Sequence, residues 1–152
     1  MADRTLVIDL TSLALAAAAV NLIAGALGAW LWWLVAPDRR FWPVLRLAQA
    51  AAVAFALYAG VLVVTGDAPE GSLFLVYALL PVPVNVVAEQ LRAVSAQTVL
   101  DARGLESARA LAGRSDAEQR SVLRAILRRE MGVMAAAALV VAFLLVRAGT
   151  SA

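Results

Sequence analysis

Four long apolar segments constrain the fold of this chain more than any other feature. They cover residues from about 6–36, 44–66, 73–94 and 131–147. A helix needs roughly 20 apolar residues to cross a hydrocarbon core of about 30 Å. Only 16% of the residues are charged, against about 25% in ordinary soluble domains. The sequence therefore predicts an all-α integral membrane protein, a bundle of four transmembrane helices that forms a single polytopic domain.

The first segment is interpreted as a retained helix and not as a cleaved signal peptide. It is longer than the apolar region of a signal peptide, and Asp3 and Asp9 dilute the positive charge of Arg4. The end of this segment carries Trp30, Trp32 and Trp33, and tryptophans are enriched in the aromatic belt at a membrane interface.

The placement of arginine predicts the orientation of the four helices. Arg39 and Arg40 lie between the first two segments, and seven more arginines lie between Arg103 and Arg129. The connection over residues 65–72 contains no basic residue. Because short cytoplasmic loops are enriched in positive residues, both basic connections are expected in the cytoplasm and both termini outside.

The composition excludes several kinds of chemistry. The chain has no Cys, His or Lys, so it offers no thiolate, imidazole or Schiff-base chemistry and no usual zinc or haem ligands. We expect no cofactor, no metal and no enzymatic activity. An enzyme would have to use Glu89 or Asp101 as acid or base and Ser95 or Thr98 as nucleophile, and no supporting constellation accompanies them.

The third segment carries a polar row. Tyr77, Pro81, Asn85, Glu89 and Arg92 follow one another at helical steps of four, four, four and three residues, which places them on one face. Glu89 is expected near the cytoplasmic edge of the hydrocarbon core, where a charge costs less than at the centre.

Two prolines, Pro81 and Pro83, interrupt the same segment. A proline inside a helix removes a backbone hydrogen bond and kinks the helix. In a membrane the freed carbonyl must find a partner in the protein or in trapped water. A static kink and a movable hinge are both compatible with this pair.

The first two helices offer groups that complement the polar row. Gly25 and Gly28 would let the first helix approach a neighbour closely. We expect the third helix to face a groove between the first two. The residues expected to meet there are Glu89, Gln90, Arg46 and Gln49 near the cytoplasmic side, and Asn21 and Asn85 nearer the middle.

Each polar group has two interpretations. The Glu89–Arg92 pair is either an interfacial ion pair that fixes packing or a protonatable coupling site. The asparagines either join helices by hydrogen bonds or contact a ligand. A short echo between residues 20–24 and 84–88 (VNLIA, VNVVA) leaves a duplication of two hairpins open.

A helical segment is expected on the cytoplasmic side, over residues of about 100–130. Ser115 and Glu118 fit a capping box, which starts a helix at Ser115. Its apolar residues lie opposite Arg120, Arg124 and Arg128, so it either lies on an anionic leaflet or extends the fourth span. Interleaved acidic residues and the lack of an aromatic platform argue against nucleic-acid binding.

Two function classes follow. The first is a non-enzymatic subunit, assembly factor or scaffold that packs with other membrane subunits or with copies of itself. The second is a small ion- or proton-coupled transporter or channel that uses Glu89 on a kinked third helix. Arginine in place of lysine and abundant alanine suggest a high-GC bacterial genome and hence the cytoplasmic membrane.

Overall fold

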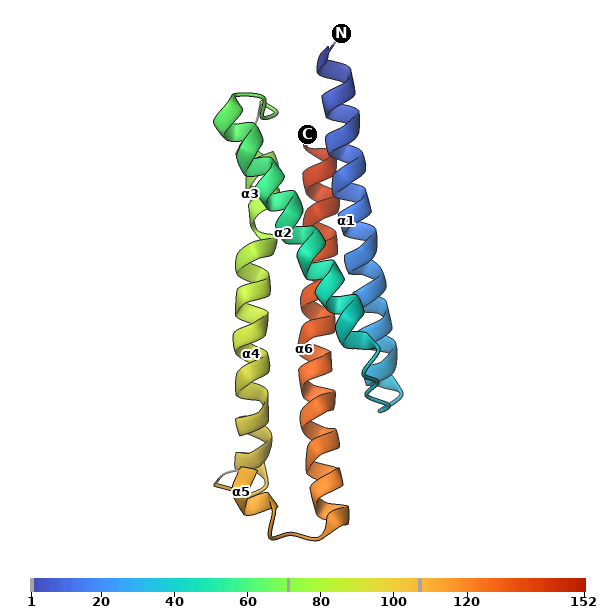
Figure 1. The fold of residues 1–152 in the computed structure, drawn as a ribbon, viewed down its shortest axis with the longest axis vertical. Helices are drawn as coiled ribbons and strands as arrows, with labels where there is room; N and C mark the ends of the chain where they lie inside the picture. Colours follow the sequence, from blue (N-terminus) through green and yellow to red (C-terminus); the bar gives the residue numbers. More distant parts are fainter. Residues whose placement is uncertain (1, 71, 107) are drawn as a thin grey trace.

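The computed structural model describes residues 2–70, 72–106 and 108–152, and 83% of the chain is helical. No strand occurs in these ranges. The helices are α1 (Ala2–Trp33), α2 (Phe41–Thr65), α3 (Ser72–Leu79), α4 (Pro81–Ala102), α5 (Ala108–Leu111) and α6 (Asp116–Thr150) (Figure 1).

Four stretches of the described chain are long and apolar enough to cross a membrane: Leu10–Trp33, Phe41–Thr65, Leu73–Ala102 and Asp116–Thr150. The prediction of an all-helical chain with four candidate spans is therefore confirmed, and these features suggest a multi-pass membrane protein.

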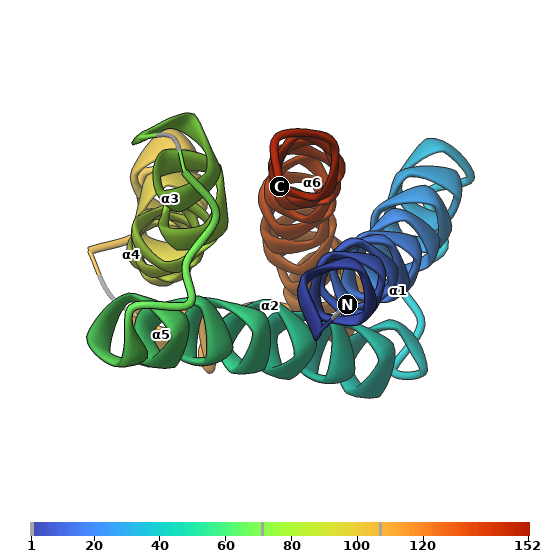
Figure 2. The ribbon, with the colours of Figure 1, turned by 90° about the horizontal axis from the view of Figure 1, so that it is seen from above.

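Helix α6 lies between α1 and α4, and α2 crosses one side of this row (Figure 2). The expectation that the third span faces a groove between the first two is thus wrong, because α6 occupies the place beside α1. A Cβ added at Gly25 would lie 2.7 Å from the Leu139 side chain, and one added at Gly28 would lie 2.8 Å from Cβ of Ala135. Small residues on α1 therefore allow the close approach that the sequence predicted, to α6 at both glycines and also to Phe41 of α2 at Gly28.

Buried apolar residues form three clusters along the molecule. One joins both ends of the chain to α2 and α3, with Phe55 and Phe74 edge to face at 6.5 Å between centroids. A second surrounds Phe41 and Met134. The third holds the α4–α5–α6 hairpin together and consists of Leu100, Leu105, Leu111 and Val122.

The third span is interrupted at Leu80, between α3 and α4. Pro81 occupies the start of α4 and has no N–H to donate to the carbonyl of Tyr77 four residues earlier. Leu80 itself keeps helical angles, φ −54° and ψ −32°. The interruption therefore lies where the prolines predicted a kink, and it is a local break in hydrogen bonding within one span.

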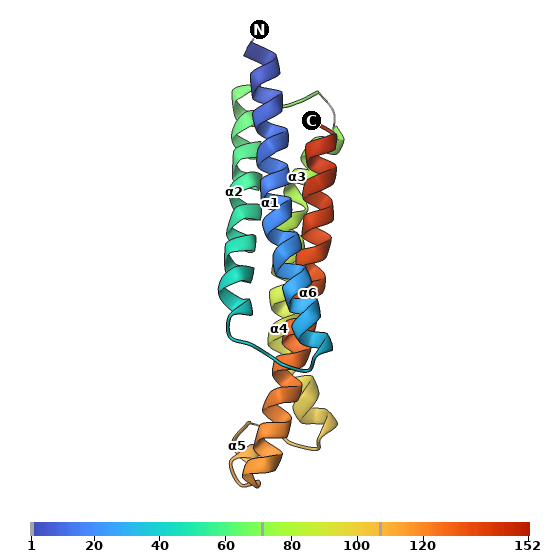
Figure 3. The same cartoon turned by 90° about the vertical axis from the view of Figure 1, so that its right-hand side faces the viewer.

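Helix α6 is continuous over 35 residues, or roughly 50 Å at 1.5 Å per residue. Ser115 caps it by accepting a hydrogen bond from the backbone N–H of Glu118 at 3.4 Å. The Glu118 carboxylate contacts Arg114 at 3.4 Å, so only one half of the capping box is formed. The α4–α5–α6 hairpin extends beyond the α1–α2 loop (Figures 1 and 3).

Candidate functional site: a polar cluster between α2, α4 and α6

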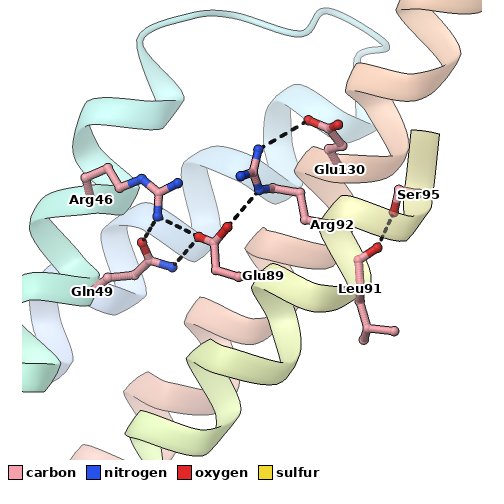
Figure 4. A network of polar contacts seen from close by, with 7 residues as sticks. All are labelled: Arg46, Gln49, Glu89, Leu91, Arg92, Ser95 and Glu130. Carbon is pink, nitrogen blue, oxygen red and sulfur yellow. Dashed lines mark hydrogen bonds and ion pairs between the residues drawn. The ribbon is translucent and has the colours of Figure 1, made fainter. Parts of the chain in front are cut away.

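Glu89 on α4 accepts hydrogen bonds from three side chains (Figure 4). Nη1 of Arg46 lies 2.6 Å from its Oε1, and Nε2 of Gln49 lies 3.1 Å from the same oxygen. Nε of Arg92 lies 2.8 Å from Oε2. Arg46 also donates to Oε1 of Gln49 at 2.6 Å. Both oxygens of the carboxylate are therefore held, and α2 is joined to α4.

Arg92 extends the cluster to α6. Its Nη1 lies 3.8 Å from Oε2 of Glu130, and its guanidinium lies 5.5 Å from the centroid of the Trp42 ring. We call Arg46, Gln49, Glu89, Arg92 and Glu130 the Glu89 cluster. Two arginines balance two glutamates in it, so the cluster carries no net charge when all four are ionised.

Helix periodicity explains this geometry. Arg46 and Gln49 lie one turn apart near the start of α2, and Glu89 and Arg92 lie one turn apart on α4, so each pair shares a face. The side chains are only partly enclosed, with 53% of Arg46 and 28% of Glu89 exposed. Hydrogen bonds to an ionised group are roughly twice as strong as neutral ones. The cluster therefore joins three helices and gives both oxygens of the Glu89 carboxylate a hydrogen-bond donor.

Asn21 is buried and joins α1 to α2. Its Nδ2 donates to the carbonyl oxygens of Ala17 and Ala48, both at 2.9 Å. The expected hydrogen bond between Asn21 and Asn85 is not made, because Nδ2 of Asn21 donates to Ala17 and Ala48 instead. Nδ2 of Asn85 is enclosed and has no hydrogen-bond partner within the described ranges.

Gln90 also differs from its expected place. It is exposed, and it makes no side-chain hydrogen bond with any described residue of the cluster. It follows Glu89 directly, and successive helical residues point about 100° apart. The Glu89 side chain faces α2, so that of Gln90 points away from it.

Apart from Glu89, the candidate catalytic residues form side-chain hydrogen bonds with residues of their own helix, four positions away. Ser95 donates to the carbonyl of Leu91 at 2.8 Å, and Thr98 to that of Val94 at 3.0 Å. Asp101 accepts from Gln97 at 2.7 Å. In the part of the chain that the structure describes, no three His, Cys, Asp or Glu side chains gather in an arrangement that could hold a metal ion.

Sequence reasoning missed Glu130 and Trp42 as members of this region. A signal existed for both. Glu130 is the last acidic residue before the fourth apolar run, and Trp42 lies at the start of the second. Each therefore had the same expected depth as Glu89 and Arg46, near the cytoplasmic edge of the hydrocarbon core.

Two apolar grooves flank α6 on the side away from α2. One, of about 500 Å³, lies between α4 and α6; the other, of about 490 Å³, lies between α1 and α6. Val133 and Ala136 border both grooves, and Val140 borders the first. We call these three residues the open face of α6, since Ala136 and Val140 are exposed and Val133 is partly exposed.

The function of the chain has to be inferred from its own contacts. Comparison with protein-family models, curated proteins and solved structures finds no match for it.

Proposed function

We propose that this chain is a non-enzymatic multi-pass membrane protein that serves as a subunit, assembly factor or scaffold in a larger membrane complex. The observation that carries the proposal is the open face of α6. This helix is bordered by α1, α2, α3 and α4, while Ala136 and Val140 are exposed and Val133 is partly exposed beside two apolar grooves. A transmembrane helix of a partner subunit would fill that position.

The chemistry of the open face supports a helix as its occupant. Ala136, Ala137 and Gly132 line the grooves, and small residues let helix backbones approach closely in a membrane. Arg129 borders one groove at its cytoplasmic end and is exposed. It forms no ion pair with a described residue. A partner helix could pack closely against these small residues, and a carboxylate on it at the depth of Arg129 would pair with that arginine.

The Glu89 cluster supports a packing role over a transport role. A coupling carboxylate must exchange partners during a cycle, whereas Glu89 is held by Arg46, Gln49 and Arg92 together. Such a cluster fixes the relative positions of α2, α4 and α6.

The charge distribution supports the orientation that we propose, with both termini outside a bacterial cytoplasmic membrane. Arg39, Arg40 and the seven arginines of residues 103–129 lie toward the end that carries the α1–α2 loop and the α4–α5–α6 hairpin (Figure 1). The opposite end carries the α2–α3 connection with Asp67 and Glu70. Arg4 and Arg147 are the two arginines nearer that end.

The test is the composition of the native particle. The chain would be extracted in mild detergent at its natural expression level, and every co-purifying protein would be identified with its stoichiometry. Ala136→Trp fills the groove, so we expect it to expel a stoichiometric partner. Leu57→Trp on α2, where the wild-type side chain is 67% exposed, is the matched control and should leave the complex intact.

A homo-oligomer or a monomer in wild-type extracts would overturn the proposed role with a foreign partner. If the Ala136→Trp variant keeps the partner, the interface lies elsewhere on the chain. The open face of α6 would then no longer support the proposal.

One observation favours the second candidate, a small ion- or proton-coupled transporter or channel. The unpaired Nδ2 of Asn85 lies one turn beyond the interruption at Leu80 and Pro81, and broken helices with free polar groups form binding sites in transporters. Glu89→Gln would abolish coupled flux in liposomes in that case. Flux that is unchanged by this substitution would exclude Glu89 as the coupling group.

A further inference from the structure

A second polar feature lies outside the Glu89 cluster, on the α4–α5–α6 hairpin. A cavity of about 420 Å³ opens there beside α6, and four arginines line it. Arg120, Arg124 and Arg128 follow one another at steps of four on α6, and Arg103 reaches it from the end of α4. We call this cavity, lined also by Ser121 and Val35, the arginine pocket.

The four guanidinium groups have no counter-ion in the described chain. None of them lies within 4.0 Å of a described carboxylate. Arg103 contacts Oγ of Ser121 at 3.5 Å, which leaves its charge uncompensated. Like charges at a spacing of four residues repel one another along a helix. The pocket thus gathers positive charge that only an external anion would neutralise.

Two contacts hold one side of the pocket in place. Nε of Arg128 donates to the carbonyl oxygen of Trp32 at 3.3 Å, and its guanidinium lies over the Trp32 ring at 5.1 Å. Val35, three residues further on, has a φ of +54°. A β-branched residue rarely adopts this left-handed conformation, and such strain is retained where the surrounding structure enforces it. The end of α1 is therefore fixed against the arginines of α6.

The pocket lies where an apolar surface meets a polar one. Trp32 and Trp33 close the first span, as tryptophans do at the level of lipid headgroups. Val35, Ala117 and Ala125 give the pocket an apolar side. Arginine binds phosphate through two parallel hydrogen bonds, and basic pockets beside transmembrane helices accept phosphorylated headgroups.

We propose that the arginine pocket binds a phosphate-bearing anion with at least two negative charges, presented by the headgroup of a membrane lipid. Four arginines around one cavity exceed the charge that a headgroup with a single phosphate can neutralise. The proposal goes beyond the role in a membrane complex and does not depend on it. A site of this kind would couple the position of the hairpin to the lipid composition of the leaflet.

The experiment uses the full chain in neutral detergent and measures bound lipid by native mass spectrometry. The probes are cardiolipin, which carries two phosphates, phosphatidylglycerol with one, and phosphatidylcholine, which is neutral. We expect cardiolipin to bind at least about tenfold more tightly than phosphatidylglycerol. The double variant Arg120→Gln, Arg124→Gln should remove that preference.

The control is the double variant Arg39→Gln, Arg40→Gln, which removes two charges from the exposed α1–α2 loop at the same end of the molecule. We expect it to keep the preference for cardiolipin. An equal loss in both double variants would show diffuse attraction to anionic lipid and would overturn the proposal. No preference for two phosphates over one would overturn it as well.

A further arm separates lipid from soluble phosphate. If inorganic pyrophosphate displaces cardiolipin at a similar concentration, the pocket binds phosphate groups, but the proposal that a lipid headgroup presents them is wrong. Arg124→Lys keeps the charge without the planar guanidinium, so it should weaken binding less than Arg124→Gln. Circular dichroism of each variant would report whether the hairpin stays folded.

Discussion

Nη1 of Arg46 on α2 lies 2.6 Å from Oε1 of Glu89 on α4, although the two residues are 43 positions apart in the sequence. The same oxygen accepts from Gln49, and the other oxygen accepts from Arg92. A single carboxylate therefore links two separate helices at one depth, and Glu130 adds the third through Arg92.

Glu89→Gln should destabilise the bundle. The substitution removes the charge that Arg46 and Arg92 share, and hydrogen bonds to charged groups contribute about 1.5–3 kcal/mol when enclosed. Because 53% of Arg46 is exposed, we expect a loss near the lower end, about 1–2 kcal/mol. Thermal unfolding in detergent would measure it. Glu70→Gln, in the exposed α2–α3 connection, is the control and should change stability by less than about 0.5 kcal/mol.

A double-mutant cycle on Arg46→Gln and Glu89→Gln isolates the pair. Residues in direct contact give coupling energies of about 0.5–3 kcal/mol. Additive effects of the two substitutions would mean that the contact contributes nothing to stability.

Gly28→Ala should destabilise the packing of α1. A Cβ at this position would lie 2.5 Å from Cε2 of Phe41 and 2.8 Å from Cβ of Ala135. Phe41 is fully buried, so it has no free space in which to move. Overpacking costs about 1–3 kcal/mol. Gly60→Ala on α2 is the matched control, because a Cβ there meets nothing within 4 Å. It should leave the unfolding temperature unchanged or raise it, and a fall as large as that of Gly28→Ala would contradict the packing explanation.

Some features of the fold and the site could be read from the sequence. The apolar segments are long enough to make four helices unavoidable in a membrane. The contact between Arg46, Gln49 and Glu89 was predictable from depth, since these residues lie near matching ends of two spans. The helix start at Ser115 followed from its capping chemistry, and the backbone N–H of Glu118 confirms it.

Neighbour relations could not be read in the same way. Alanine is so frequent that almost every helix face offers small residues, so the sequence does not reveal that α6 lies between α1 and α4. Asn21 bonds to the carbonyl of Ala48, and every residue has a carbonyl, so no pattern marks this partner. The helix start at Ser115 was predicted, but the packing of Val122 with Leu100, Leu105 and Leu111 was not.

Val35→Gly should stabilise the α1–α2 connection. Val35 has a φ of +54°, and the left-handed conformation costs an L-residue about 1–2 kcal/mol that glycine does not incur. Glycine loses more entropy on folding, by about 0.5–1 kcal/mol, so the net gain should be about 0.5–1 kcal/mol. Val64→Gly, at an 87% exposed position in the last turn of α2, should instead lower the unfolding temperature. A fall for both variants would show that Val35 is not strained.

Ser115→Ala should loosen the start of α6. The Ser115 hydroxyl accepts the N–H of Glu118, and loss of such a cap costs about 0.5–2 kcal/mol. The effect should be local, because the first turns of α6 lie in the protruding hairpin, far from the Glu89 cluster. Hydrogen exchange would measure it as faster exchange over residues 116–122 with unchanged protection over 131–147. Ser115→Asp keeps an acceptor at the cap and adds a negative charge where the helix dipole favours one, so it should retain protection. Equal loss in Ser115→Ala and Ser115→Asp would mean that α6 is held by Val122 and its apolar neighbours, and not by the cap.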